Sequence, residues 1–188
     1  MIDFRSDNVH CVPDQIINAI IEANTGTVSS YGGDELTKKA CNLLSKLFDK
    51  DLSSFFVSTG TAANALALSC VTPPFGTIFC GADSHIYLEE CNAPEFFSGS
   101  AKLFPVPTAK GKIVPNDLSR FVHNHPEDKY DMVASSLSIS QATECGTIYT
   151  TSEIKQIIEI ARSKNLSIHM DGARFANVVA ATNKRPSD

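Results

Sequence analysis

The sequence predicts an α/β fold with three layers (αβα), in which a mostly parallel sheet lies between two layers of helices. Short apolar runs typical of strands alternate with segments of helical periodicity along the chain. Several of these runs are apolar on both faces, as expected for strands that helices cover on both sides. No internal repeat or low-complexity segment interrupts the alternation.

The composition is that of an ordinary globular protein. Of the 188 residues, 43% are hydrophobic and 20% are charged. The chain has 16 basic and 21 acidic residues without a basic cluster, which argues against nucleic-acid binding. The apolar runs are too short to cross a membrane, and MIDFRSDNVH has no signal-peptide core. We therefore expect a cytoplasmic protein without membrane or nucleic-acid partners.

The six cysteines form neither a C-x-x-C pair nor a zinc-binding pattern with histidines. We expect them to be free thiols that pack as small apolar side chains. The sequence thus predicts no disulfide framework and no metal site.

Two helices are predicted before residue 50. The first opens at Pro13 and repeats isoleucine at helical spacing, and the second follows the turn-rich segment NTGTVSSYGG. Their apolar positions are Ile16, Ile17, Ile20 and Ile21, and then Leu36, Ala40, Leu43, Leu44 and Leu47.

The later elements alternate between strand and helix. In chain order they are a strand at 53–57, a helix at 60–71, a strand at 77–80, a helix starting within 85–91 and a strand at 133–139. Thr150 and Glu153 then form a capping-box pattern before a helix, and LSIHM at 166–170 closes as a strand.

Ligands of parallel sheets lie beyond the carboxyl ends of the strands, and unusual residues follow three of the predicted strands. After FFV, the residues Thr59, Gly60 and Thr61 turn the chain directly into a helix. Glycine allows a ligand to approach the backbone closely, and the free amides of a helix start attract anions. An ordinary N-cap is the alternative reading, and no lysine follows as in a P-loop.

His85 follows the strand that ends in IFC. An imidazole there could stack on an aromatic cofactor or transfer protons, although a lone histidine is more often structural. Glu89, one helical turn later, could point the same way, but a solvated position is the simpler reading.

The last predicted strand ends in Asp171, with Arg174 three residues later. A carboxylate beside a pyridine nitrogen keeps that nitrogen protonated and strengthens the ring as an electron acceptor. A guanidinium group binds a carboxylate with two parallel hydrogen bonds. Each feature alone has a structural explanation, but an anion site, a stackable ring and this acid–base pair at successive strand ends together fit one phosphorylated pyridine.

At this point the sequence resembles a known family. The segments IDFRSDN, YGGDELT, STGTAAN, HIYLEE and HMDGARFAN occur in the order and spacing of the N-terminal half of the threonine aldolases. These are pyridoxal-phosphate (PLP) enzymes of fold type I. The resemblance implies the PLP-binding large domain of that fold, with an N-terminal arm at 1–12 and the N-terminal part of the domain at 13–188.

The resemblance also implies site residues. Thr59, Gly60 and Thr61 would bind the cofactor phosphate, His85 would stack on the ring and handle the substrate hydroxyl, and Asp171 would pair with the ring nitrogen. His85 and Asp171 are thus the expected catalytic residues.

The resemblance further assigns Ser6 and Arg174 to the substrate carboxylate and places Tyr31 near the site, often from a neighbouring subunit. Family members are homo-oligomers, usually tetramers built from dimers. The implied reaction is retro-aldol cleavage of a β-hydroxy-α-amino acid, such as L-threonine or L-allo-threonine, to glycine and an aldehyde.

Three departures from the family pattern are visible. SISQATECG replaces an acidic, asparagine-containing stretch, so Gln141 or Thr143 is the candidate for a polar contact to the ring, and Asn8 stands where threonine is common. The family lysine that binds PLP covalently follows the DGAR strand, whereas Lys184 lies in a polar NKRPSD segment and is not expected to take that role.

We accordingly expect the 188 residues to be a fragment, truncated before the C-terminal domain, with negligible aldolase activity alone. Two alternatives remain at this point. The chain could be an inactive truncated product that acts only in assembly or binding, or it could belong to another β-eliminating lyase of fold type I.

Overall fold

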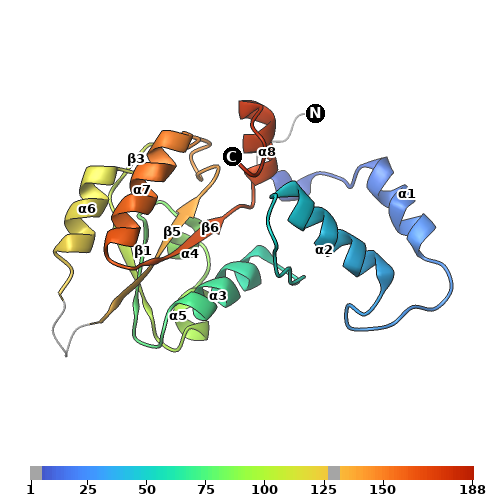
Figure 1. Ribbon diagram of the computed structural model, residues 1–188, viewed down its shortest axis with the longest axis horizontal. Helices are drawn as coiled ribbons and strands as arrows, with labels where there is room; N and C mark the ends of the chain where they lie inside the picture. Colours follow the sequence, from blue (N-terminus) through green and yellow to red (C-terminus); the bar gives the residue numbers. More distant parts are fainter. Residues whose placement is uncertain (1–5, 127–131) are drawn as a thin grey trace. The chain divides into compact units, whose positions relative to one another are not determined.

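A computed structural model describes residues 6–126 and 132–188 (Figure 1). The chain forms two compact units, Met1–Ser53 and Ser54–Asp188. The start of the IDFRSDN motif lies outside the described residues. The expected division between an arm at 1–12 and a domain at 13–188 stays a prediction.

The first unit contains the two predicted helices and a short 3-10 helix. These elements are η1 (Asp7–Val9), α1 (Asp14–Ala23) and α2 (Glu35–Leu47). The Asp34 carboxylate caps α2 by accepting a hydrogen bond from the Thr37 amide at 2.8 Å. The four isoleucines of α1 keep 42 to 64% of their surface exposed. Helical periodicity therefore predicted α1 correctly, but this unit alone does not bury its apolar face.

The second unit is built on a four-stranded sheet in the order β2-β1-β5-β6. Its strands are β1 (Thr77–Gly81), β2 (Lys102–Val106), β5 (Ala134–Ser140) and β6 (Ser167–Asp171). All three neighbouring pairs are parallel, which confirms the predicted sheet type. The carboxyl ends of the four strands therefore meet at one edge of the sheet. A small antiparallel pair, β3 (Thr108–Ala109) and β4 (Lys112–Ile113), is separate from this sheet.

Helices occupy the connections and the end of this unit. They are α3 (Gly60–Val71), α4 (His85–Leu88), α5 (Ala93–Phe97), α6 (Pro115–His123), α7 (Thr151–Ser163) and α8 (Phe175–Thr182). In Figure 1, α3 lies beside α5 and α6 lies beside α7, and both pairs are in contact.

The side chains of β1 alternate between two apolar clusters, which shows that the sheet is covered on both faces. Phe79 belongs to an apolar cluster with Leu118 of α6 and Ile157 of α7. Its neighbours Ile78 and Cys80 belong to a second cluster, which includes Leu68 of α3. Successive strand residues point to opposite faces, so the two clusters are the two helix–sheet interfaces of a three-layer fold. The predicted architecture is confirmed.

One predicted strand is wrong. Residues 53–57 are not in a strand, and Phe55 and Phe56 are 85% and 65% exposed. The aromatic and β-branched composition of this segment favours a strand, but a strand also needs a neighbour for its backbone hydrogen bonds. In the described part of the chain, β6 ends the sheet and residues 53–57 do not pair with it.

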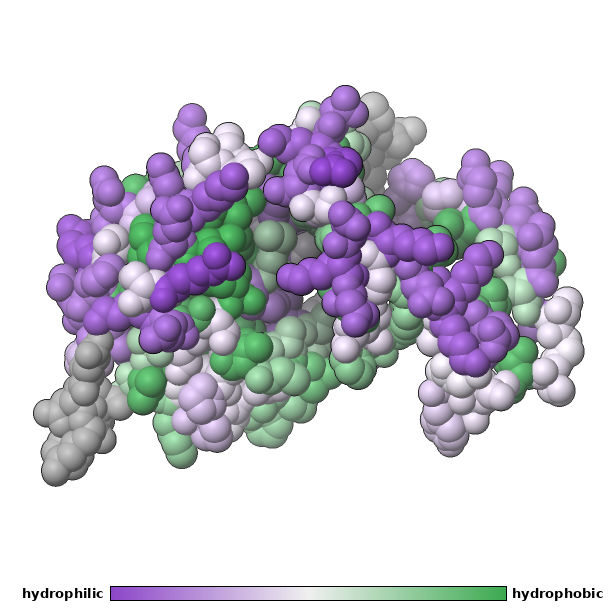
Figure 2. Space-filling model, in the orientation of Figure 1, coloured by the Kyte–Doolittle hydropathy of each residue, from purple (hydrophilic) through white to green (hydrophobic). Residues whose placement is uncertain are grey.

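The surface of this unit is uneven in polarity. Hydrophilic residues cover much of the visible outer surface over α6 and α7, whereas apolar groups appear along the lower edge of the view, over α3 and α5 (Figure 2). The exposed apolar residues on these two helices include Leu66, Phe96 and Phe97. No helix of the described ranges is both long and apolar enough to cross a membrane.

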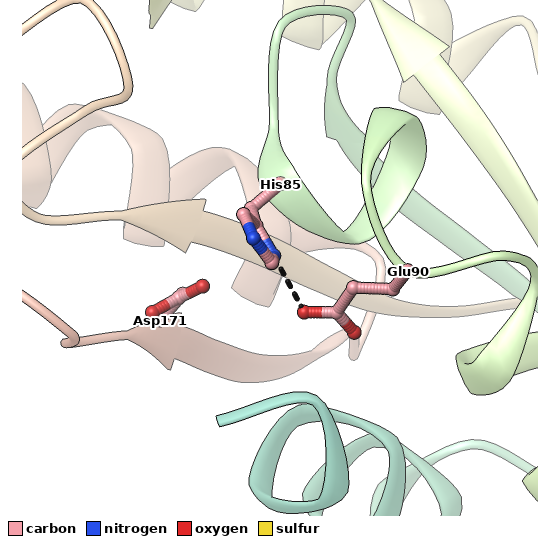
Figure 3. Close-up of side chains that lie close together, drawn as sticks. All are labelled: His85, Glu90 and Asp171. Atoms are coloured by element: carbon pink, nitrogen blue, oxygen red, sulfur yellow. Dashed lines mark hydrogen bonds and ion pairs between the residues drawn. The ribbon is translucent and has the colours of Figure 1, made fainter. Parts of the chain in front are cut away.

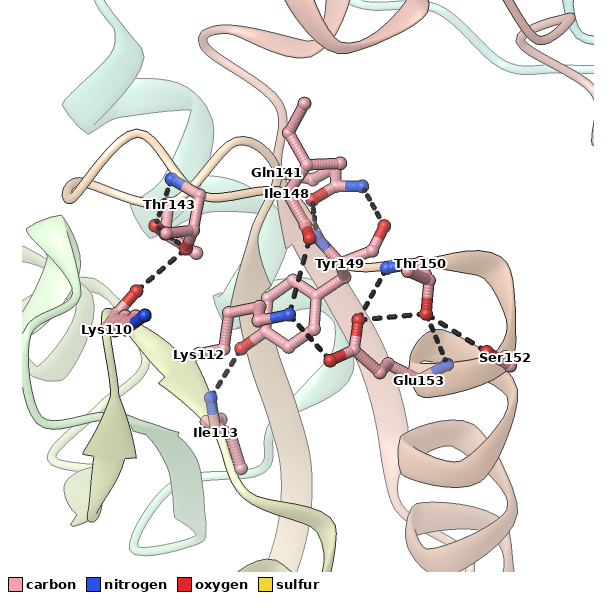
Figure 4. Close-up of polar contacts among 11 residues, drawn as sticks. Lys110, Lys112, Ile113, Gln141, Thr143, Ile148, Tyr149, Thr150, Ser152 and Glu153 are labelled. Atoms are coloured by element: carbon pink, nitrogen blue, oxygen red, sulfur yellow. Dashed lines mark hydrogen bonds and ion pairs between the residues drawn. The ribbon is translucent and has the colours of Figure 1, made fainter. Parts of the chain in front are cut away.

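A polar network anchors the start of α7 to the β3–β4 pair (Figure 4). Thr150 and Glu153 form the predicted capping box, and Lys112 donates to Glu153 at 2.6 Å. The Ile113 amide donates to the Tyr149 hydroxyl at 2.7 Å, and burial raises the pKa of that hydroxyl to about 12. The hydrogen bond from Lys112, together with those from Thr150, lowers the pKa of Glu153 to about 2.

We expect Glu153→Gln to lower the free energy of unfolding by about 1 kcal/mol near pH 7, because it weakens a helix cap and a partly exposed ion pair. Since the folded pKa of Glu153, about 2, is below its ordinary 4.5, its contribution is complete above 4.5. That contribution is lost as the pH falls from 4.5 towards 2.

Urea midpoints of wild type and variant, measured from about pH 7 to about pH 3, test this expectation. Glu159→Gln, at an exposed position of α7, is the matched control. If the urea midpoint of the wild type exceeded that of the variant by the same amount down to about pH 3, the assigned ion pair would be contradicted.

Candidate active site

Asp171 ends β6 and starts a turn into the last helix. Its Oδ1 accepts a hydrogen bond from the Ala173 amide at 3.0 Å, an arrangement typical of an aspartate-initiated turn. Its Oδ2 accepts from Nδ2 of Asn64, on α3, at 3.0 Å. The strand therefore ends in a carboxylate because that group both turns the chain and connects to a helix on one face of the sheet.

His85 begins α4, four residues after β1 ends, and its side chain is 45% exposed. Its Nδ1 lies 2.8 Å from Oε1 of Glu90, and its backbone amide donates to Glu144 at 2.8 Å. Figure 3 shows the imidazole between Glu90 and Asp171. The structure thus brings together the two residues predicted to be catalytic.

Two further residues connect this cluster and were not assigned from sequence. Glu90 has a fully buried side chain, and Nδ2 of Asn64 donates to its Oε1 at 2.8 Å. Asn64 lies in the quoted STGTAAN motif, one turn into α3, so its position was a usable signal. Glu90 was missed because helical spacing from His85 points to Glu89. The helix ends at Leu88, and Glu89 is exposed.

The start of α3 is open to solvent. Thr59 is its N-cap, and the threonine hydroxyl accepts a hydrogen bond from the Ala62 amide at 3.0 Å. Gly60 is exposed, and a side-chain carbon added to it would meet no atom within 4 Å. Thr61 is half-buried on the first turn. The N-cap reading of Thr59 is therefore correct, and the same helix start leaves space for an anion.

Gln141 and Thr143 lie in the loop after β5. The Gln141 amide binds the backbone of Tyr149 at both ends, with Nε2 donating at 3.0 Å and Oε1 accepting at 3.0 Å. Thr143 is buried and its hydroxyl lies 2.8 Å from that of Thr147. Both side chains hold the loop in shape, and their predicted contact with a cofactor ring stays a prediction.

The three residues predicted to bind substrate lie in different parts of the chain. Arg174 is exposed at the N-cap of α8, three residues after Asp171. Ser6 accepts a hydrogen bond from the Asn8 amide at 3.2 Å, and Tyr31 is fully exposed with a φ of 57°. Ser6 and Tyr31 belong to the unit Met1–Ser53, so their roles stay predictions.

A second histidine lies just behind Asp171. His169 is buried on β6, and its Nδ1 lies 2.8 Å from the Ser138 hydroxyl of the neighbouring strand. Burial lowers the pKa of His169, which the nearby Asp171 carboxylate only partly offsets. Burial on β6 therefore favours the neutral form of this imidazole.

Lys184 forms its hydrogen bond with a residue outside this cluster. Its ammonium group donates to the Thr151 hydroxyl at 2.8 Å, at the start of α7. That Lys184 is not the lysine that binds a cofactor covalently stays a prediction. No residue of the described ranges is assigned that role.

The residues at this edge fit a phosphorylated pyridine. Gly60 leaves space beside the open amides of α3 for a phosphate, the Asp171 carboxylate accepts hydrogen bonds, and the His85 ring is half-exposed. Ligand atoms of His85, Glu90 and Asp171 also lie within 4.8 Å of one another, a spacing seen in metal sites. Hydrogen bonds already join His85 and Asn64 to Glu90, so we interpret the cluster as a hydrogen-bonded network.

The layered parallel sheet is that of the large domain of fold-type-I PLP enzymes. A lysine-to-alanine variant of serine palmitoyltransferase from S. paucimobilis, with a bound PLP–myriocin aldimine, aligns with a TM-score of 0.59 at 16% sequence identity. The alignment covers 83% of this chain and 38% of that chain. At this identity the likeness shows the fold alone.

The chain belongs to the beta-eliminating lyase family, whose model matches residues 3–188. It is 36% identical to the low specificity L-threonine aldolase of Pseudomonas aeruginosa over 98% of this chain and 53% of that protein. Threonine aldolase of Leishmania major aligns with a TM-score of 0.84 at 25% identity, over 92% of this chain and 50% of that one. The chain thus spans about half the length of the relatives it matches.

We expect Gly60→Val to reduce affinity for PLP on the order of ten-fold, because the new side chain fills the space in front of the α3 amides. Stability should change by less than about 1 kcal/mol, since no atom lies within 4 Å of the added carbon. Equilibrium dialysis against PLP, with urea midpoints measured in parallel, gives both quantities.

Pyridoxal, which lacks the phosphate, is the matched control ligand. Its affinity should be the same for wild type and Gly60→Val, because only phosphate contacts are removed. Equal affinity of both proteins for PLP would refute a phosphate site at the start of α3.

Proposed function

We propose that the protein carrying this chain is a PLP-dependent aldolase that cleaves L-threonine or L-allo-threonine to glycine and acetaldehyde. The observation that carries the proposal is the convergence of Asp171, His85 and the open start of α3 at one edge of the sheet. The names of the relatives at 36% and 25% identity support the same reaction.

The cofactor would be held by residues at the start of α3 and at or after the ends of β1, β5 and β6. Thr59, Gly60 and Thr61 would bind the phosphate at the start of α3, where the helix dipole favours an anion. His85 would lie against the ring, and Asp171 would bind the protonated ring nitrogen. Gln141 would contribute to cofactor binding by holding the loop after β5 in shape, through its two hydrogen bonds with the Tyr149 backbone.

Substrate binding requires a group for the amino-acid carboxylate. Arg174 has the planar donor fork that matches a carboxylate, and it lies at the N-cap of α8, three residues after the end of β6. The family resemblance adds Ser6 and Tyr31 as further candidates for substrate binding.

Bound PLP supplies an electron sink for the bond that breaks. The Asp171 carboxylate, which accepts a hydrogen bond from Asn64, would stabilise positive charge at the ring nitrogen. His85 accepts the proton of the substrate hydroxyl at Nε2 while the Cα–Cβ bond breaks and the hydroxyl carbon becomes an aldehyde. Arg174 would keep the amino-acid part oriented until Cα takes up a proton, which balances the proton that Nε2 accepted, and the product leaves as glycine.

We further propose that the protein works as a homo-oligomer, a dimer or a tetramer. The isoleucines of α1 are 42 to 64% exposed, and Phe96 and Phe97 of α5 are 79% and 58% exposed. Apolar side chains gathered on two helices are typical of surfaces that associate.

A β-elimination is the second candidate reaction, favoured by the description of the family whose model matches. It would use the same Asp171 and Arg174 but would release a group from the β-carbon instead of breaking the Cα–Cβ bond. Comparing threonine with cysteine and tryptophan separates the two, because only the aldolase produces glycine.

We expect Asp171→Asn to lower kcat for threonine cleavage by about 100-fold or more, because a neutral amide no longer stabilises charge at the ring nitrogen. The fold should persist, since an amide oxygen still accepts from Asn64. The assay uses protein from the complete reading frame, saturated with PLP, and quantifies glycine and acetaldehyde.

Asp188→Asn, at an exposed carboxylate bound to Arg185, is the control and should leave kcat unchanged. Normal turnover by Asp171→Asn would remove Asp171 from the mechanism. Absence of glycine from the wild-type reaction would remove the aldolase assignment.

A further inference from the structure

Glu90 is a buried carboxylate for which the proposed mechanism so far has no use. Its side chain is 0% exposed. It follows the end of α4, and the next two residues, Cys91 and Asn92, have left-handed φ values of 49° and 61°. This turn leads the chain into α5 directly after the carboxylate. A charged side chain in such a position requires hydrogen-bond donors to compensate its lost hydration.

Both donors come from the candidate active site. Oε1 of Glu90 lies 2.8 Å from Nδ1 of His85 and 2.8 Å from Nδ2 of Asn64. Its Oε2 is buried without a hydrogen-bond partner among the described residues. All of the hydrogen bonding described for this carboxylate therefore passes through His85 and Asn64.

Asn64 extends the connection to Asp171. Its Nδ2 also donates to Oδ2 of Asp171 at 3.0 Å, so one amide nitrogen lies between two carboxylates. An amide nitrogen carries two hydrogens and only donates, and one hydrogen serves each carboxylate. Asn64 thereby fixes the spacing of Glu90 and Asp171 and reduces the repulsion between them.

The same contacts determine the tautomer of His85. A carboxylate oxygen accepts hydrogen bonds, so the ring nitrogen facing Oε1 of Glu90 must carry the proton. A neutral imidazole has only one N–H group. The other nitrogen, Nε2, is then without a proton and can accept one.

We infer that Glu90 is a positioning residue that holds His85 as the Nδ1–H tautomer and, through Asn64, holds Asp171 in place. The role of Nε2 as proton acceptor rests on the proposed function, whereas the tautomer is a property of the protein itself. Buried carboxylates behind catalytic histidines act in this way in other enzymes, where their loss slows the reaction strongly by changing the tautomer.

The direct test is the ¹⁵N NMR spectrum of His85 in protein from the complete reading frame, assigned with His85→Gln. At a pH where the ring is neutral, we expect the Nδ1 signal of a protonated nitrogen and the Nε2 signal of an unprotonated one. The opposite pattern, with the proton on Nε2, would overturn the inference.

Two variants at the position extend the test. Glu90→Leu removes the acceptor, so the Nε2–H tautomer should appear and kcat for threonine cleavage should fall on the order of 100-fold, with a smaller change in KM. Glu90→Gln keeps an oxygen that accepts from His85 and Asn64, so it should retain the tautomer and most of kcat. Equal losses in both variants would contradict positioning through hydrogen bonds.

Glu89→Leu and Glu89→Gln are the matched controls, because Glu89 is the exposed neighbour. Both should keep the wild-type tautomer and kcat. If Glu90→Leu fails to fold, the wild-type spectrum and Glu90→Gln still decide the question. An unprotonated Nε2 in a protein that does not cleave threonine would reject the proposed function and support the inference. A proton on Nε2 in an active aldolase would support the proposed function and reject the inference.

Discussion

The side-chain amide of Asn64 connects the parts of the chain that form the candidate site. Its nitrogen donates to Glu90 at 2.8 Å and to Asp171 at 3.0 Å, and these carboxylates come from the turn after α4 and from the end of β6. Two carboxylates this close repel each other, and shared donors offset that repulsion. The position of His85 depends on the same arrangement, because its Nδ1 hydrogen bond ends on the oxygen that Asn64 also binds.

The fold supplies the conditions for this contact. Parallel pairing of β1, β5 and β6 brings their carboxyl ends to one edge of the sheet. Two apolar clusters, one on each face, hold the covering helices against the strands. The start of α3 is thereby fixed within hydrogen-bonding distance of the end of β6. A site of this kind needs rigid elements behind it, because small displacements of its groups weaken binding and catalysis.

Periodicity and capping patterns predicted the elements whose stability is local. The helix at 60–71 has the predicted bounds, and the Thr150–Glu153 capping box is present. The strand at 53–57 was wrong because its formation depends on a neighbour elsewhere in the chain. Strand propensity carries no information about such a neighbour.

The candidate site was predictable where a strand end placed a residue at the edge, as for His85 and Asp171. Glu90 could not be identified because α4 ends at Leu88 and helical spacing no longer applies beyond it. The role of Asn64 was hidden for another reason, since its partners lie 26 and 107 residues away in the sequence. Gln141 was recognised as an unusual polar residue, but its two contacts with Tyr149 depend on the shape of the loop.

The chain covers 53% of its Pseudomonas relative. It still contains the residues to which the proposal assigns the phosphate, the ring and the ring nitrogen of the cofactor. The most direct measurement is a crystal structure of the protein from its complete reading frame with PLP bound. The account predicts the phosphate at the amides of Gly60 and Thr61, the ring nitrogen on Asp171 and the His85 imidazole against the ring, with Glu90 still bound to His85. A cofactor whose phosphate or ring nitrogen contacts other residues would contradict it.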